Sequence, residues 1–164
     1  MLKVARKMNE LSFSKLMEVY EEGNLENGQD FWPEESQWRQ IALAEEAFYD
    51  YLQQVFFQTD GASYLIWEED GRYLSALRLE PYRDGLLLEA LETSPKYRKM
   101  GYGTYLVSAA LEYAGEIKIY AHVGKKNAAS LRTHQKCGFQ RILEYAAYAD
   151  GSVDDRCCTL VHES

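Results

Sequence analysis

A glycine-containing turn between two apolar segments constrains this chain more than any other feature. The turn reads Arg98-Lys99-Met100-Gly101-Tyr102-Gly103. The apolar run of residues 86–91 precedes it, and apolar residues recur at helical spacing over residues 105–111. The pattern predicts a strand, a tight turn and the start of a helix, which together form one unit of an α/β fold.

A turn of this kind predicts an anion-binding site. The first N–H groups of a helix lack partners within the helix, and the helix dipole adds partial positive charge there. Glycine lets the backbone approach a ligand without a side chain in the way. Lys96, Arg98 and Lys99 add positive charge in a chain whose net charge is −8. Phosphate is the ligand that suits this combination.

Length and composition indicate one globular domain over residues 1–164. This length is enough for a hydrophobic core, and 46% of the residues are hydrophobic. No apolar run approaches the ~20 residues that a membrane helix needs. Lys3, Arg6 and Lys7 interrupt the N-terminal segment, so we expect no signal peptide, no membrane partner and a cytoplasmic protein.

The charge balance and the cysteines limit the classes of ligand and partner that we expect this chain to bind. A sequence pI of about 4.9 argues against nucleic acid and mildly favours a cationic substrate. Three cysteines leave one unpaired in any disulfide scheme. They do not lie at zinc-ligand spacing with the histidines, so we expect no metal and interpret Cys137, Cys157 and Cys158 as small buried residues.

Periodicity and turn residues predict the element order β, α, α, β, β, β, α, β, α, β, β. Strands are expected at residues 2–8, 62–68, 72–82, 86–93 and 117–123, and at about 139–148 and 153–162. Helices are expected at 12–22 with Ser12 as cap, from about residue 35, from Gly101 to Gly115, and at 127–137 with Asn127 as cap. Residues 23–33 are expected to form a loop, because they contain Gly23, Gly28 and Pro33. One face of the long second helix is expected to carry Trp38, Ile41, Ala44, Phe48, Leu52 and Val55.

With these residues in place, the chain resembles the GNAT superfamily of acetyl-CoA-dependent N-acetyltransferases. The element order matches over nearly the whole chain, and the turn matches the family pattern Arg/Gln-x-x-Gly-x-Gly/Ala. Downstream, the family commonly has Asn, a small residue, Tyr and Gly-Phe, and this chain has Asn127, Ser130, His134, Gly138 and Phe139. His134 departs from the usual Tyr. The resemblance implies a mixed, mostly antiparallel seven-stranded sheet flanked by about four helices.

The resemblance also implies where acetyl-CoA, as a cosubstrate, would bind. Its pyrophosphate would lie on the turn and helix start at Arg98, Lys99, Met100, Gly101, Tyr102, Gly103 and Thr104. The pantetheine arm would pair with the backbone around Leu91 and Thr93, and Asn127 and Ser130 would contact it from the other side. Lys125 and Lys126 are candidates for the 3′-phosphate, and a solvated basic loop is the alternative.

Three side chains are candidates for the acid and base of acetyl transfer. His134 occupies the position of the family's Tyr and is the candidate acid, with a packing or capping role as the alternative. Glu89 and Glu92 are candidate bases, because a carboxylate in an apolar strand is costly to bury unless it is paired or used. Strand alternation is expected to place them on opposite faces. Glu80, His122 or a base acting through water remain alternatives, and amides near residues 91–93 would polarise the acetyl carbonyl.

The expected function is acetyl transfer to a small cationic amine by direct attack in a ternary complex. Acidic and aromatic groups of residues 21–32 suit such an acceptor, among them Glu21, Glu22, Glu26, Asp30, Phe31 and Trp32. Three alternatives remain: a protein or peptide amine as acceptor, a catalytically silent acyl-CoA binding or sensing module, and an interaction domain. The chain is expected to be a monomer or a homodimer.

Overall fold

The computed structural model describes residues 1–164 and contains the mixed, mostly antiparallel seven-stranded sheet that the sequence predicts. The strand order is β1-β2-β3-β4-β5-β9-β6, and only β4 and β5 are parallel neighbours. The strands are β1 (Leu2–Ala5), β2 (Ser63–Glu69), β3 (Arg72–Tyr82), β4 (Gly85–Thr93), β5 (Ile119–Gly124), β6 (Gln140–Leu143) and β9 (Cys157–His162). A separate two-stranded ribbon pairs β7 (Ala146–Ala147) with β8 (Val153–Asp154).

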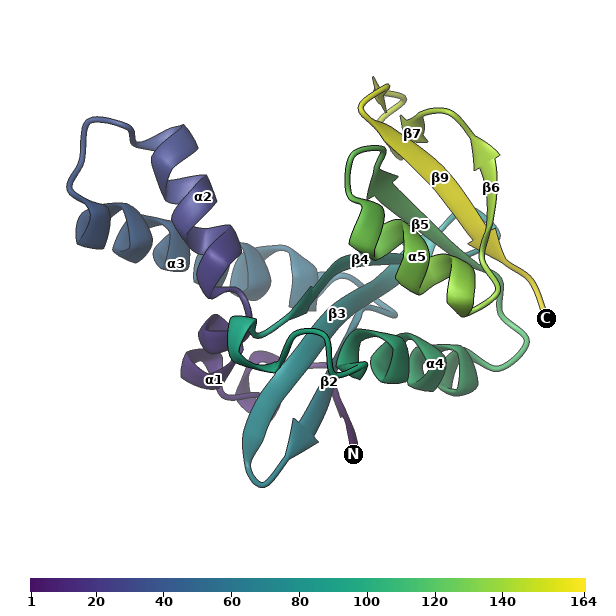
Figure 1. The fold of residues 1–164 in the computed structure, drawn as a ribbon, viewed down its shortest axis with the longest axis horizontal. Coiled ribbons are helices and arrows are strands. Elements are labelled where there is room, and N and C mark those ends of the chain that lie inside the picture. The colour runs from purple at the N-terminus through teal and green to yellow at the C-terminus, as the bar shows by residue number, and fades with distance from the viewer.

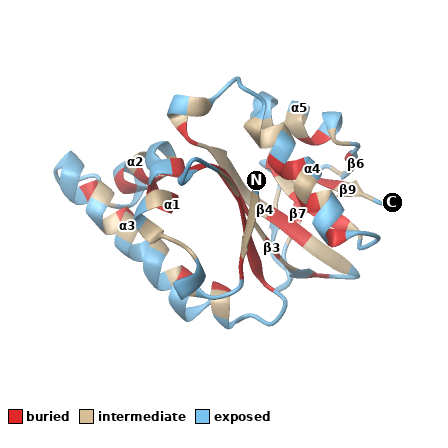
Figure 2. Ribbon diagram, turned by 90° about the horizontal axis from the view of Figure 1, so that it is seen from below, coloured by how far each residue is buried: buried red, intermediate tan, exposed pale blue.

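Five α-helices cover the two faces of this sheet. One face carries α1 (Phe13–Val19), α2 (Glu21–Phe31) and α3 (Gln37–Gln54), and the other carries α4 (Tyr102–Ala114) and α5 (Ala128–Lys136) (Figures 1 and 2). Short 3-10 turns lie at Met8–Glu10, Phe56–Gln58 and Pro95–Tyr97. Both predicted caps are confirmed, because the Ser12 side chain accepts the Lys15 N–H and the Asn127 side chain accepts the Ser130 N–H. None of the helices has the length and apolarity needed to span a membrane.

A hydrophobic core lies on each face of the sheet. Leu77 and Leu79 of β3 pack toward α4, in a cluster with Leu106 and Val107. Residues of opposite parity pack toward α1 and α3, among them Tyr64, Ile66 and Ala76. Successive residues of the central strands therefore point alternately into the two cores. The sheet is buried on both sides where the helices cover it (Figure 2).

The loop predicted for residues 23–33 is wrong, because α2 occupies most of this segment. Gly28 lies where α2 crosses α3, and a Cβ added there would come within 2.7 Å of the Gln40 carbonyl oxygen. The Gln40 side-chain amide also donates to the Trp32 carbonyl at 3.0 Å. This glycine permits close helix packing instead of a turn, and the chain consequently has five α-helices where about four were predicted.

The predicted apolar face of α3 is only partly correct. Ala44 and Leu52 are buried, but Trp38 is 71% exposed and Val55 is 52% exposed. The α2–α3 pair projects beyond the edge of the sheet, so the first turns of α3 have no sheet beneath them (Figure 1). The two long C-terminal strands predicted at 139–148 and 153–162 are each broken, into β6 with β7 and β8 with β9.

The parallel strands β4 and β5 pair over only three positions and then separate. Leu86, Leu87 and Leu88 pair with residues 119–121, after which β4 continues to Thr93 and β5 to Gly124 without pairing with each other. An opening therefore lies between the ends of two adjacent strands. Its β4 side leads through the short Pro95–Tyr97 turn directly into the glycine turn before α4.

A bulge in β4 overturns the prediction that Glu89 and Glu92 lie on opposite faces. Glu89 pairs with Arg78 and Glu92 pairs with Ala76, so two residues of β4 lie opposite the single Leu77. Arg78 and Ala76 are two residues apart and share a face, and the two glutamates therefore share it as well. Ala90, inside the bulge, has a positive φ of 55°.

Candidate active site

The first turn of α4 presents uncapped amides, as the glycine motif predicts. Gly101 occupies the N-cap position with φ 87°, and no side chain caps the helix. The first helical hydrogen bond is the one from the Tyr105 N–H to the Gly101 carbonyl, at 2.9 Å. A Cβ added at Gly103 would lie 3.4 Å from Thr93 Oγ1, in the space between the turn and the end of β4. A helix start of this kind suits a phosphate group, because N–H donors and the helix dipole point the same way.

A cleft of about 850 Å³ lies between this turn, the end of β4 and the first turns of α5. Most of the predicted coenzyme residues line it: Leu91, Thr93, Arg98, Lys99, Gly101, Tyr102, Gly103, Thr104, Asn127 and Ser130. Met100 does not, and its side chain is 58% exposed. The structure thus brings together residues from three separate segments. The cleft is also lined by Glu22 and Glu26 of α2, so it reaches helices on both faces of the sheet.

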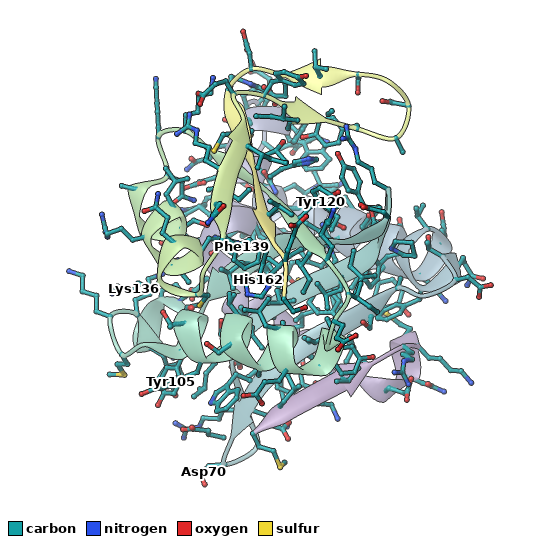
Figure 3. The ribbon with its side chains drawn as sticks, turned by 90° about the vertical axis from the view of Figure 1, so that its right-hand side faces the viewer. Asp70, Tyr105, Tyr120, Lys136, Phe139 and His162 are labelled. Atoms are coloured by element: carbon teal, nitrogen blue, oxygen red, sulfur yellow. The ribbon has the colours of Figure 1, made fainter.

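Two further cationic side chains, which the sequence analysis did not predict as site residues, also line the cleft. Arg132 and Lys136 lie four residues apart on α5 and face it, and Lys136 extends from the end of that helix (Figure 3). Their spacing from each other was the available signal, since residues four apart share a helix face. Lys125 and Lys126, the predicted 3′-phosphate ligands, do not line the cleft.

Carboxylates form the opposite wall of the cleft and hold Arg98. The Arg98 guanidinium donates to Glu22 Oε2 at 2.6 Å and lies 3.7 Å from Glu92 Oε2, and its Nε–H donates to the Thr93 carbonyl at 3.3 Å. Burial raises the pKa of Glu92 above its ordinary value, and Arg98 opposes this. Glu26 lies one turn beyond Glu22 on the same face of α2.

Glu89 is half-buried beside Arg78 on the α1–α3 face, outside the residues that line the cleft. Arg78 Nε is 3.7 Å from Glu89 Oε1, and neither atom has a hydrogen-bond partner. The Arg78 guanidinium lies over the rings of Tyr51 and Phe56, at 5.0 and 5.6 Å from their centres. Burial raises the pKa of Glu89 to about 7, against the opposing charge of Arg78. A carboxyl group that titrates there can exchange protons at neutral pH.

His134 is buried behind the cleft and does not line it. Its Nδ1 lies 2.7 Å from the Ser130 carbonyl, which can only accept, so Nδ1 carries the proton. Its Nε2 has no partner, although the residue is only 1% exposed. Burial lowers the pKa of His134, so the neutral ring presents a lone pair at Nε2. The ring packs edge-on against Phe139, which in turn lies beside His162 (Figure 3).

His122 lies on the same face of the sheet as Glu89 and is held by aromatic neighbours. Its Nε2 is 3.3 Å from the Tyr82 hydroxyl, and that hydroxyl donates its own proton to the Ala147 carbonyl. The Tyr82 oxygen therefore accepts from His122. The His122 ring packs edge-on against Tyr82 and Tyr148, and burial lowers its pKa. No group of three or more His, Cys, Asp or Glu side chains is arranged to hold a metal ion.

Comparisons with known proteins identify the family. Residues 16–139 match the Acetyltransferase (GNAT) family, so the chain belongs to it. No curated protein matches the chain in a sequence search. Among solved structures, the chain is similar to a paia N-acetyltransferase from Thermoplasma acidophilum in complex with coenzyme A. The TM-score is 0.62 at 13% identity, with 100% of this chain and 99% of that chain covered.

Two other solved structures are similar over nearly the same length. One is a mutant of a spermidine N-acetyltransferase from Vibrio cholerae, with TM-score 0.62, 17% identity, and 99% of this chain and 92% of that chain covered. The other is the ribosomal-protein-S18-alanine N-acetyltransferase from Escherichia coli, with TM-score 0.60, 16% identity, and coverages of 99% and 94%. At these identities the similarity establishes the fold. Family and fold together support an acetyltransferase that uses acyl-CoA.

Proposed function

We propose that this protein transfers an acetyl group from acetyl-CoA to a small cationic amine, by direct attack of the amine in a ternary complex. The observation that carries this proposal is the uncapped first turn of α4, which opens into a cleft beside the separating strands β4 and β5. That cleft offers amides and cations at one end and carboxylates at the other. One end suits a diphosphate and the other suits an ammonium group.

The residues present fit the coenzyme. The amides of Tyr102, Gly103 and Thr104 would hold its pyrophosphate, with Lys99, Arg132 and Lys136 supplying positive charge. The N–H groups of Leu91 and Thr93 point away from β3, and that of Thr93 would pair with the pantetheine arm while that of Leu91 faces the acyl end. Asn127 and Ser130 would contact the arm from α5. When bound, acetyl-CoA supplies an activated acyl group with a thiolate leaving group.

The chemistry requires three proton transfers. An ammonium acceptor first gives up one proton, which is released to solvent, to become nucleophilic. Its nitrogen then forms a C–N bond with the acyl carbon as the C–S bond breaks, the nitrogen loses a second proton, and the sulfur gains one. Glu89, with a pKa of about 7, is the proposed base, directly or through water. For His134 to protonate the thiolate, its Nε2 must first take up a proton, because the neutral ring carries its proton at Nδ1. The Leu91 amide is the proposed partner of the carbonyl oxygen.

Three acidic side chains support a cationic acceptor. Glu22, Glu26 and Glu92 line the cleft into which the thioester end of the coenzyme would extend. Arg98 of the turn pairs with Glu22 and Glu92, whereas Glu26 makes no ion pair and is the carboxylate proposed to attract an ammonium group. A spermidine N-acetyltransferase shares the fold, which is consistent with this acceptor class.

The test is release of free thiol from acetyl-CoA with spermidine, with a diamine and with a peptide that has a free N-terminal alanine. We expect turnover with the polyamines and a much lower kcat/KM with the peptide. Preference for the peptide would replace the proposed acceptor with a protein amine. Calorimetric binding of acetyl-CoA without turnover on any amine would favour a sensing module, and absence of binding would overturn the proposal.

A further inference from the structure

A bulge residue in β4 adopts a backbone conformation that its own side chain disfavours. Ala90 has φ 55°, in the left-handed region where a Cβ crowds the following carbonyl and strains the backbone. Glycine would avoid this strain, but the chain has alanine here. The surroundings must therefore hold Ala90 in place, and the conformation persists only if specific contacts determine it.

A pair of buried tyrosines holds the Ala90 carbonyl. The Tyr20 hydroxyl donates to the Ala90 carbonyl oxygen at 2.6 Å, and the Tyr64 hydroxyl donates to the Tyr20 oxygen at 2.7 Å. Tyr20 is 5% exposed and Tyr64 is fully buried, so water does not compete for these bonds. Burial raises the pKa of both phenols, which keeps them neutral and able to donate. This relay of hydrogen bonds, from Tyr64 to Tyr20 to the Ala90 carbonyl, links β2 and the α1–α2 junction to the bulge.

Two backbone hydrogen bonds show what the bulge does to β4. The Leu86 N–H donates to the Lys118 carbonyl on the β5 side, whereas the Ser94 N–H donates to the Leu74 carbonyl on the β3 side. In a regular strand, residues eight apart point their N–H groups to the same side. The inserted residue reverses this, so after the bulge the amides of Leu91 and Thr93 point away from β3 into the opening. Without the bulge, this stretch would present the amides of Ala90 and Glu92 to the opening.

We infer that Tyr20, supported by Tyr64, is a positioning residue that holds the β4 bulge and so aims the Leu91 amide at the acyl carbonyl. The inference rests on the proposed acyl transfer for its catalytic consequence, but not for its structural one. Tyr20 does not line the cleft and does not touch the reacting atoms. It acts through the carbonyl of Ala90, on the backbone segment that carries the two amides.

The test is Tyr20→Phe, which removes the hydroxyl and keeps the ring. Loss of one buried neutral hydrogen bond should lower kcat about fivefold to tenfold. We expect the KM for acetyl-CoA to change less than twofold, because the turn before α4 is untouched. Hydrogen exchange of the Ser94 amide, measured by NMR on the free protein, should accelerate, since its bond to Leu74 depends on the register after the bulge.

A rescue variant and a matched control separate positioning from general stability. Ala90→Gly in the Tyr20→Phe background should restore at least half of the lost kcat, because glycine adopts positive φ without steric cost. Tyr73→Phe is the control, since Tyr73 is also buried and its hydroxyl also bonds a backbone group, which is the Ser12 N–H at the start of α1 and not the β4 bulge. It should lose comparable stability in urea without losing kcat or Ser94 protection.

Each outcome decides one part of the inference. If Tyr20→Phe matches Tyr73→Phe in both kcat and exchange, or if glycine at position 90 restores nothing, Tyr20 is only a structural residue. A wild-type protein without transferase activity would overturn the proposed function. The exchange comparison would still decide whether the relay holds the bulge.

Discussion

Replacing Glu89 with glutamine should change the pH dependence of stability in a direction that the structure fixes. The ordinary carboxyl pKa of 4.5 rises to about 7 in the folded protein, mainly through burial. Because the folded protein holds this proton more tightly than the unfolded chain, it binds more protons between pH 4.5 and 7. The contribution of Glu89 to stability is therefore present at low pH and is lost as the pH rises through this window.

The size of the effect follows from the same pKa values. A difference between 4.5 and about 7 corresponds to roughly 3 kcal/mol, which is an upper bound because the side chain is 25% exposed. The free energy of unfolding of wild type, relative to Glu89→Gln, should thus fall by about 2–3 kcal/mol between pH 4.5 and pH 8. Without Arg78 the fall would be larger, because Arg78 pairs with the ionised form and lowers the pKa of Glu89.

Urea denaturation followed by circular dichroism measures this difference at each pH. Glu46→Gln, which removes an exposed carboxylate from α3, controls for the loss of one charge. The kcat/KM of the wild type should rise with pH, with a midpoint near pH 7. The kcat/KM of Glu89→Gln should not show this rise. A wild-type-to-variant difference in unfolding free energy that stays constant from pH 4.5 to pH 8 would refute the burial argument.

Four other substitutions test the remaining parts of the site. Gly103→Val should weaken acetyl-CoA binding at least tenfold in calorimetry with little loss of stability, because its side chain enters the space beside Thr93. Gly28→Ala should destabilise by about 1 kcal/mol in urea, since the clash with Gln40 exceeds the roughly 1 kcal/mol gained in helix propensity. Arg132→Ala should raise the KM for acetyl-CoA and weaken its salt dependence. His134→Phe should lower kcat more than coenzyme affinity, and unchanged turnover would remove His134 from the mechanism.

Local signals in the sequence predicted the elements that local chemistry determines. Ser12 and Asn127 cap their helices because a side-chain oxygen reaches an amide three residues on, which needs no tertiary contact. The start of the helix at Gly101 was predicted correctly for the same reason, since the positive φ of this glycine is a property of the turn itself. The position of the cleft followed from these elements, because both predicted motifs begin helices that line it.

The errors arise where a distant contact determines the local structure. Gly28 has the composition of a loop residue, and only the approach of α3 explains it within a helix. Ala90 carries no sequence signal for a positive φ, because the hydroxyl that holds it comes from Tyr20, seventy residues earlier in the chain. The prediction for Glu89 and Glu92 failed through this one residue, since strict alternation assumes an unbroken strand.

The bulge also determines which face of the sheet carries Glu92. With the bulge, Glu92 shares the α1–α3 face with Glu89, and Leu91 packs toward the α4 core. In an unbroken strand, Glu92 would turn to the α4 face, where the uncapped amides and the cations of the cleft lie. A carboxylate there would compete with phosphate for the same donors and repel it by like charge. The bulge in β4 therefore keeps Glu92 off the face that carries the uncapped amides, where Arg98 of the turn reaches around to pair with it.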